Sequence, residues 1–331
     1  CGNNEVASAW LSWGWKEELP DSIWDDYRKL FHELLPKVCS ELDPQRLYWP
    51  SSPCHGTDQS NQDQIYGKGD NHYWGVWHGG DDFNAFDDNV GRFMTEYGMQ
   101  SFPSMSMIES FTNEKDRSLD SDVMNAHQKA SLGTGNLMKY VEDYYQVNDD
   151  FDSIAGLSQI MQAEAIRFAV ETHRRNMPYC MGTLYWQFND CWPVISWSSI
   201  DYGGNWKALH YAARKFFSPL LVSMRDLDNK IEIHVINDQH HEIESEIRLG
   251  LFNFNGDTLF NDSSDIKVEP FSSVIYRAFD KDDLLGGSDP SAIMFRAELF
   301  VGGKVLSRAH QFFKRPKHLS IPSPDFDYEI E

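Results

Sequence analysis

Two glutamates stand in sequence contexts suited to catalysis. Glu5 closes the opening segment CGNNE, and Glu96 lies about ninety residues later in RFMTEYGMQSFPS. Both are predicted to lie where a strand runs into a loop. Two carboxylates that face one substrate can hydrolyse a glycoside, because one donates a proton while the other attacks the anomeric carbon. A strand that ends at Glu5 has almost no chain before it, so we expect this sequence to be part of a larger protein.

The elements that position these glutamates alternate between helical and extended patterns. Residues 25–44 repeat apolar side chains at helical spacing, which predicts an amphipathic helix that Pro44 ends. The region between Asp120 and Arg175 is again helical in pattern. Aromatic and apolar runs predict strands at residues 46–50, 71–80, 91–98 and 181–190.

Alternating strands and helices predict parallel βα units. Carboxylates and aromatic residues at the downstream ends of strands are typical of a (β/α)8 barrel, whose active site gathers at that face. The sequence supplies four whole strands and the end of another, whereas a closed barrel of this kind has eight. The predicted fold class is therefore α/β plus all-β, with about half of such a barrel.

From about Phe217 the pattern changes to alternating strands. The runs are KIEIHVIND, EIRLGLFNF, SVIYRAF and IMFRAELF, with turns at FNGD and VGGK. Ile231, Ile233 and Val235 share one predicted face. We predict an immunoglobulin-like β-sandwich over residues 217–318, followed by an acidic, proline-containing linker at residues 319–331. The other predicted face carries Ile293, Phe295, Ala297 and Leu299.

Composition narrows the range of partners. The net charge of −22 argues against a nucleic acid or an anionic membrane surface, because such binding requires Lys and Arg to replace counterions. A neutral substrate fits better. Eleven Trp and fourteen Tyr are typical of sugar sites, where rings stack on the sugar, but also of ordinary packing. No apolar run has the length of a membrane span.

Cysteine usage and metal motifs imply no cofactor. Five cysteines at irregular spacing form no CxxC pair, so we expect buried free thiols. The sequence contains no HExxH motif, no clustered Cys/His set and no acidic calcium loop. Residues 133–136 (GTGN) lack the Lys of a phosphate-binding loop and are predicted to form a flexible turn.

Several segments together resemble the β-mannosidase branch of glycoside hydrolase family 2. They are CGNNE, YWPSSPCHG, GDNHYWGVWHGG, MTEYGMQSFPS and the long run at residues 182–223, and the resemblance covers essentially the whole chain. It implies that residues 1–216 run from the end of the fourth barrel strand through the eighth strand and its helix. It also implies an N-terminal half that completes the barrel and a small sandwich beyond Glu331.

The resemblance implies roles for both glutamates. Glu5 matches the general acid/base and Glu96 the nucleophile, while Asn4 matches the residue that binds the sugar 2-hydroxyl. A retaining mechanism then requires the two carboxyl groups to lie about 5 to 5.5 Å apart. Trp10 and Trp13 are expected to give Glu5 an apolar wall that favours its protonated form.

Four further residues are candidates for substrate binding by the same resemblance. Trp186 matches the floor of the −1 subsite, and Trp13 matches an aromatic residue that lines the same pocket. Trp77 and His78 lie where the family contacts the sugar or the nucleophile. Ordinary core packing is the alternative for each of them.

The implied activity is that of a retaining exo-β-mannosidase acting on β-mannoside oligosaccharides or glycan ends without a cofactor. A β-galactosidase or β-glucuronidase would use the same machinery on another sugar. A third alternative is a catalytically incomplete, carbohydrate-associated fragment. The compartment stays open, although a periplasmic, extracellular or lysosomal setting fits the resemblance better than the cytoplasm.

Overall fold

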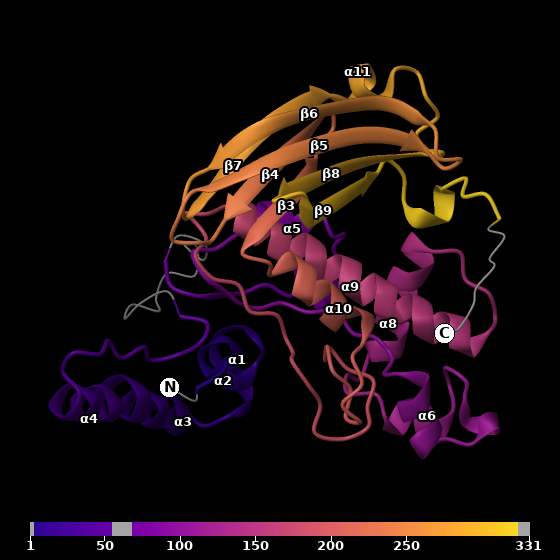
Figure 1. The fold of residues 1–331 in the computed structure, drawn as a ribbon. Coiled ribbons are helices and arrows are strands. Elements are labelled where there is room, and N and C mark those ends of the chain that lie inside the picture. Colours follow the sequence, from indigo (N-terminus) through magenta and orange to yellow (C-terminus); the bar gives the residue numbers. More distant parts are fainter. Residues whose placement is uncertain (1–2, 55–67, 324–331) are drawn as a thin grey trace. The chain divides into compact units, whose positions relative to one another are not determined.

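The computed structural model describes residues 3–54 and 68–323 (Figure 1). The chain divides into two compact units, the first formed by residues 1–98 and 179–186 and the second by residues 99–178 and 187–331. This division follows contacts in space rather than the ends of domains. The domain boundaries expected at residues 216 and 318 therefore stay predictions.

Most pairings between extended segments of the first unit are parallel, with one antiparallel bridge between Cys54 and Asp70. Strand β1 (Asn71–His72) pairs in parallel with strand β2 (Met94–Glu96). Single parallel bridges join Asn4 to Ser52 and Met94 to Thr183. Parallel neighbours in sequence order are the arrangement of barrel strands, and the first unit is accordingly part of a (β/α)8 barrel.

The predicted barrel strands are shorter than expected or absent. Residues 46–50 form no strand, and residues 181–190 make only isolated bridges. Strand pairing of residues 91–98 is confined to β2, and residues 71–80 are a strand only at β1 before they turn at η3 (Gly75–Gly79). Pro50 cannot donate a ladder hydrogen bond. Inside η3, Val76 and Trp77 both depart from helical geometry, and Trp77 has a positive φ of 82° that ends any extended run. The aromatic composition of this segment therefore does not determine its secondary structure.

The predicted helix at residues 25–44 is confirmed. Segments α3 (Asp21–Arg28), η1 (Lys29–Leu34) and α4 (Leu35–Leu42) follow one another without a break, and the last ends shortly before Pro44. The ring of Tyr27 stacks on that of Trp24 with centroids 4.9 Å apart, and Trp24 stacks on Trp10 at 5.5 Å. Shorter helices of the first unit are α1 (Val6–Ser12), α2 (Trp15–Glu18) and α5 (Ala85–Asp88).

The helical region predicted up to Arg175 is also confirmed. Its main element, α9 (Phe151–Arg175), begins at Asp150, whose side chain accepts a hydrogen bond from the backbone N–H of Ser153. The turn predicted at residues 133–136 is wrong, because these residues open α8, whose buried Leu137, Tyr140 and Val141 stabilise the helix by packing. The remaining helical segments of the second unit before the sandwich are α6 (Met105–Phe111), η4 (Glu114–Asp116), α7 (Asp122–Ala126), α8 (Gly133–Tyr144) and α10 (Ala208–Phe216).

Two antiparallel sheets form the predicted sandwich of the second unit (Figure 1). The three-stranded sheet has the order β3-β4-β7, and the four-stranded sheet has the order β6-β5-β8-β9. Both apolar faces expected from the sequence are buried in one core. The strands are β3 (Leu220–Asp226), β4 (Lys230–Asn237), β5 (Ile243–Asn253), β6 (Thr258–Val268), β7 (Ser272–Asp280), β8 (Ile293–Val301) and β9 (Lys304–Phe312), with α11 (Lys281–Leu285) and η5 (Pro316–His318).

Cysteines in the described residues are free thiols. Cys54 and Cys180 are buried and Cys39 is partly buried, but Cys191 is exposed, so the expectation of buried thiols is wrong for Cys191. Cys1 and the end of the predicted linker lie outside the described residues. No helix within these residues is long and apolar enough to cross a membrane.

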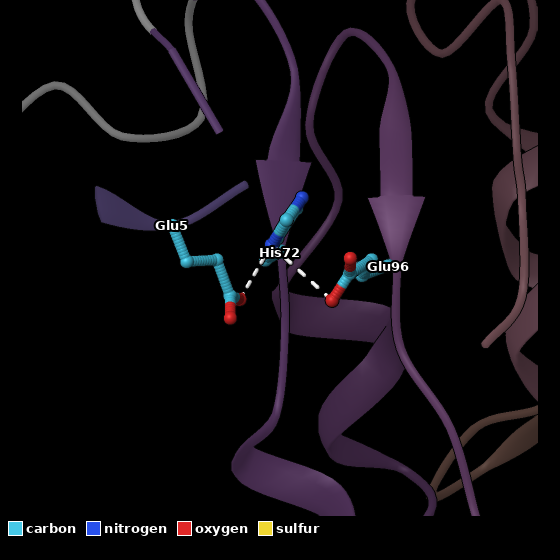
Figure 2. A group of neighbouring side chains, drawn as sticks. All are labelled: Glu5, His72 and Glu96. Atoms are coloured by element: carbon cyan, nitrogen blue, oxygen red, sulfur yellow. Dashed lines mark hydrogen bonds and ion pairs between the residues drawn. The ribbon is translucent and has the colours of Figure 1, made fainter. Parts of the chain in front are cut away.

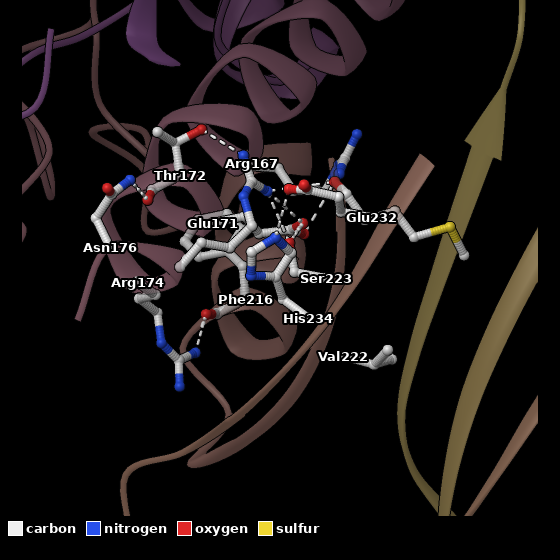
Figure 3. A network of polar contacts seen from close by, with 12 residues as sticks. Arg167, Glu171, Thr172, Arg174, Asn176, Phe216, Val222, Ser223, Glu232 and His234 are labelled. Carbon is white, nitrogen blue, oxygen red and sulfur yellow. Dashed lines mark hydrogen bonds and ion pairs between the residues drawn. The ribbon is translucent and has the colours of Figure 1, made fainter. Parts of the chain in front are cut away.

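A buried polar network ties the C-terminal end of α9 to the sandwich within the second unit (Figure 3). Ser223 on β3 donates to Glu171 at 2.6 Å and accepts from Arg175 at 2.8 Å. Arg174 donates to Asp238 at 2.8 Å. Arg174 and Arg175 lie in the last turn of α9. Cationic side chains there also interact favourably with the helix dipole, which further stabilises the contact between α9 and the sandwich.

His234 on β4 gives this network a pH dependence. Burial, followed by the charge of Arg175, lowers the pKa of His234 to about 4, whereas an unfolded histidine has a pKa of about 6.5. The unfolded state therefore binds more protons between these values. We expect the contribution of His234 to the free energy of unfolding to be constant above about pH 6.5 and to fall by about 3 kcal/mol as the pH drops to 4.

Urea denaturation of the wild type and of His234→Gln between about pH 7.5 and pH 4 measures this effect, because a glutamine side chain cannot titrate. The variant should lose less stability on acidification than the wild type. The exposed His241 provides the control variant His241→Gln, which should follow the wild type. Parallel curves for all three proteins would contradict the assignment.

Candidate active site

Glu5 and Glu96 converge on His72 (Figure 2). The Nδ1 atom of His72 lies 2.6 Å from Oε1 of Glu5 and 3.4 Å from Oε2 of Glu96. One carboxylate oxygen of each glutamate and a ring nitrogen of His72 lie within 4.8 Å of one another. All three side chains are largely buried, at 19% exposure for Glu5, 11% for Glu96 and 4% for His72. The fold thus brings together the two carboxylates that the sequence singled out.

Backbone geometry explains this convergence. His72 and Glu96 are register partners at the ends of β1 and β2, and parallel pairing places their side chains next to each other. Glu5 precedes α1 with a φ of 57°, which lies in the left-handed region, and its N–H donates to the carbonyl of Ser52 at 2.7 Å. A non-glycine residue in this region is strained, and such strain is concentrated at functional sites.

Several groups act on the Glu96 carboxyl. Burial is the largest influence and raises the pKa of Glu96, and the charge of Glu5 raises it further. The positive charge of His72 and hydrogen bonds from the Trp74 and Asn4 side chains lower it. The net effect is a raised pKa, so these interactions only partly offset the cost of burying a charge.

A second carboxylate anchors His72 from the other side. The Nε2 atom of His72 lies 3.1 Å from Oγ of Ser52, and that hydroxyl lies 2.6 Å from Oδ2 of Asp70. Burial alone would raise the pKa of Asp70, but the hydrogen bonds that it accepts outweigh burial and lower it. Besides Ser52, the donors to Asp70 are Trp49 Nε1 at 3.0 Å, Thr95 Oγ1 at 2.9 Å and the backbone N–H of Cys54 at 2.9 Å.

The other predicted site residues of the first unit differ in their surroundings. Asn4 reaches Glu96 by a side-chain hydrogen bond. The charge of Glu5 raises the pKa of His78 against a larger lowering by burial, which places His78 near the acid/base candidate. Trp77 is fully buried, with a φ of 82°, and its ring centroid lies 6.5 Å from that of His78. Core packing and contact with the sugar both stay open for Trp77, and its role in substrate binding stays a prediction.

Trp13 and Trp186 expose 57% and 39% of their surface. Exposed indole rings are available for stacking, but their predicted contacts with a sugar stay predictions. Trp10 instead packs in the helical layer against Trp24. An apolar wall of Trp10 and Trp13 around Glu5 likewise stays a prediction.

Sequence reasoning missed His72, Ser52 and Asp70. The segment GDNHYW contains a pattern that could have indicated Asp70 and His72. These two residues are two positions apart and so lie on the same side of an extended chain. A polar pair at the end of a predicted barrel strand is typical of a catalytic position.

The side-chain types of Glu5, His72 and Glu96 also occur in metal sites. Here, however, Nδ1 of His72 is hydrogen-bonded to Glu5 and faces Glu96. These contacts explain why the three groups lie close together. We therefore interpret the cluster as a proton-sharing one rather than as a set of metal ligands.

Comparisons with known proteins show what the chain is similar to in sequence and fold. Residues 229–318 match the family described as Mannosidase Ig/CBM-like domain. Beta-mannosidase B of Neosartorya fischeri is 32% identical over 279 residues, which cover 77% of this chain and 33% of that protein. The structure of a beta-D-mannosidase from Dictyoglomus thermophilum superimposes with a TM-score of 0.82 at 34% identity, covering 89% of this chain and 36% of that one.

A more distant structure shares the fold alone. The exo-chitosanase of Amycolatopsis orientalis has a TM-score of 0.58 at 17% identity, over 75% of this chain and 30% of that one. Together with the partial barrel and its paired glutamates, the similarities place the chain among the glycoside hydrolases. The chain belongs to the β-mannosidase branch of glycoside hydrolase family 2. It spans about a third of the length of the curated relatives that it matches.

The strained backbone at Glu5 leads to a stability prediction. The φ of 57° costs an L-residue about 1 to 2 kcal/mol, whereas glycine adopts it freely. Glu5→Gly should therefore be more stable than Glu5→Ala, by about 1 kcal/mol. Thermal unfolding of the two variants measures the difference.

Ala9 in the interior of α1 provides the control position. Ala9→Gly should lower stability by about 1 kcal/mol, because the backbone there is helical. Equal melting temperatures for Glu5→Gly and Glu5→Ala would show that Glu5 is unstrained.

Proposed function

We propose that the complete protein to which this chain belongs is a retaining exo-β-mannosidase, which removes terminal β-D-mannose from oligosaccharides or glycan ends. The observation that carries this proposal is the convergence of Glu5 and Glu96, with carboxylate oxygens within 4.8 Å of each other. Retaining enzymes hold their two carboxyl groups about 5 to 5.5 Å apart, whereas inverting enzymes require about 6.5 to 9.5 Å. Facing oxygens of the two glutamates lie closer than the inverting range, which supports double displacement.

In the first step, Glu96 attacks the anomeric carbon as a carboxylate and forms a glycosyl ester. The glycosidic bond breaks at the same time, and Glu5 gives its proton to the departing oxygen. Glu5 therefore has to enter this step protonated and Glu96 ionised. The hydrogen bonds from Trp74 and Asn4 and the charge of His72 favour the ionised form of Glu96.

In the second step, Glu5 acts as a general base. It takes a proton from water, the water oxygen bonds to the anomeric carbon, and Glu96 leaves as a carboxylate. Two inversions give net retention, and both carboxyl groups return to their starting protonation states. No cofactor is needed for either step.

The choice of mannose rests on the relatives. The similar proteins from Neosartorya fischeri and Dictyoglomus thermophilum are named beta-mannosidases. A β-galactosidase or β-glucuronidase would use the same carboxylates. Hydrolysis rates of the complete protein on nitrophenyl β-mannoside, β-galactoside and β-glucuronide separate these alternatives, and we expect the mannoside to be the best substrate.

The roles of the glutamates can be separated by azide rescue. Glu96→Ala should lower kcat by roughly 10⁴-fold or more, because it removes the nucleophile. Azide then fits the vacated space and should give the α-mannosyl azide, with inverted configuration. Glu5→Ala with azide should give the β-product, since Glu96 still forms the intermediate.

Product analysis by NMR distinguishes the two configurations. The exposed Glu41 on α4 provides the control Glu41→Ala, which should retain full activity. If azide gave the β-product with Glu96→Ala and the α-product with Glu5→Ala, the two roles would be reversed.

Residues 1–331 alone should be inactive or nearly so. They supply about half of the strands that a closed barrel requires, and unpaired strand edges promote association. We expect residues preceding Cys1 in the complete protein to close the barrel and to complete the pocket. Activity of a monodisperse 331-residue chain at ordinary glycosidase rates on nitrophenyl β-mannoside would contradict this expectation.

A further inference from the structure

The hydrogen-bond directions around His72 follow from its neighbours. The carboxylate of Asp70 only accepts hydrogen bonds, and Oγ of Ser52 lies 2.6 Å from it. Ser52 has a single hydroxyl hydrogen, which this contact uses. Its oxygen must then accept from Nε2 of His72, 3.1 Å away. The Nε2 atom of His72 therefore carries a proton.

This assignment determines what Nδ1 of His72 shares with Glu5. At 2.6 Å from Oε1 of Glu5, the contact requires one proton between the two atoms. Either His72 is neutral and Glu5 is the protonated acid, or His72 is an imidazolium and Glu5 is a carboxylate. In both forms the pair holds one proton, which is the proton that Glu5 must deliver in catalysis.

We propose that His72 is a positioning residue that holds the catalytic proton jointly with Glu5 and keeps Glu96 ionised, while Ser52 and Asp70 fix its ring. This inference rests on the proposed function and deepens it. His72 is not itself required to touch the sugar. It acts through the two glutamates on either side of Nδ1, at 2.6 Å and 3.4 Å.

The charges around His72 come from several segments. Glu5 lies before α1, Glu96 on β2 and Asp70 just before β1, and His78 in η3 senses the charge of Glu5. The imidazole thus has a glutamate on either side of Nδ1 and, through Ser52, the carboxylate of Asp70 behind Nε2. Replacing the imidazole would therefore remove both the partner that shares a proton with Glu5 and the ring nitrogen that faces Glu96.

The proton balance is closed within the pair. When the glycosidic bond breaks, the shared proton passes to the leaving oxygen, which leaves a Glu5 carboxylate and a neutral His72 protonated at Nε2. During deglycosylation, the proton taken from water returns to the pair. No additional donor or acceptor is required.

The test is the pH dependence of kcat/KM for nitrophenyl β-mannoside, measured with the complete protein. Its alkaline limb reports loss of the proton from the pair, and its acidic limb reports protonation of Glu96. In His72→Gln the alkaline limb should move to lower pH and the acidic limb to higher pH, each by about one unit. The profile therefore narrows from both sides, and kcat should fall by roughly 10²-fold, with KM nearly unchanged.

Two further variants distinguish the sharing of a proton between His72 and Glu5 from a purely structural role of His72. His72→Asn places an amide donor near the position of Nδ1, so part of kcat should return while the profile stays narrow. Ser52→Ala removes the acceptor for Nε2–H, so the alkaline limb should move to lower pH by a smaller amount. The control His241→Asn changes an exposed histidine of the sandwich and should leave both limbs in place.

Substrates with different leaving groups add an independent readout. Dinitrophenyl mannoside needs little help from an acid in its first step, so the part of the His72→Gln defect that arises from Glu5 should shrink with this substrate. The inference is overturned if His72→Gln lowers kcat while both limbs keep their positions, since a structural role alone would do that. If the wild-type complete protein does not hydrolyse β-mannosides, the proposed function fails first, and the two failures are thereby distinct.

Discussion

The parallel pairing of β1 with β2 is the constraint on which the candidate site depends. Its register sets His72 opposite Glu96, and side chains at paired positions of neighbouring strands lie on the same side of the sheet. Nothing in the chemistry of either residue alone would bring them together. Once His72 is fixed there, its Nδ1 also meets Glu5, so a backbone ladder of few residues determines the geometry of a three-residue cluster.

Burial and hydrogen bonding act in opposite directions within this cluster. Desolvation disfavours every charge, as the raised pKa of Glu96 shows. Asp70 is the contrasting case, because its hydrogen-bond donors outweigh burial and keep it ionised. The chain from Asp70 through Ser52 to His72 thus supplies a fixed negative charge behind the imidazole. Because Ser52 and His72 separate this charge from the glutamates, Asp70 can act on them through the imidazole without occupying the space between them.

Most of the fold could be predicted from periodicity, but the barrel strands could not. Helix α9 and strands such as β4 carry strong apolar patterns that determine their buried faces. The segment at residues 71–80 is rich in aromatic residues, yet it pairs only at β1 and then turns. Composition cannot distinguish an aromatic run that pairs in a sheet from one that packs in a turn, because both bury the same side chains.

The site shows the same division between local and non-local information. Glu5 and Glu96 could be found because each lies in a motif that resembles a family pattern. The role of His72 depends on contacts with residues far away in the sequence, including Glu5 and Ser52. A motif identifies the groups that react, whereas the direction of each hydrogen bond requires knowledge of which donors and acceptors surround them. For His72, that direction is set by Asp70. The contacts described for Asp70 are with Trp49, Ser52, Cys54 and Thr95, and none is with Glu5 or Glu96. The sharing of a proton between Glu5 and His72 is therefore a property of the fold rather than of the motif.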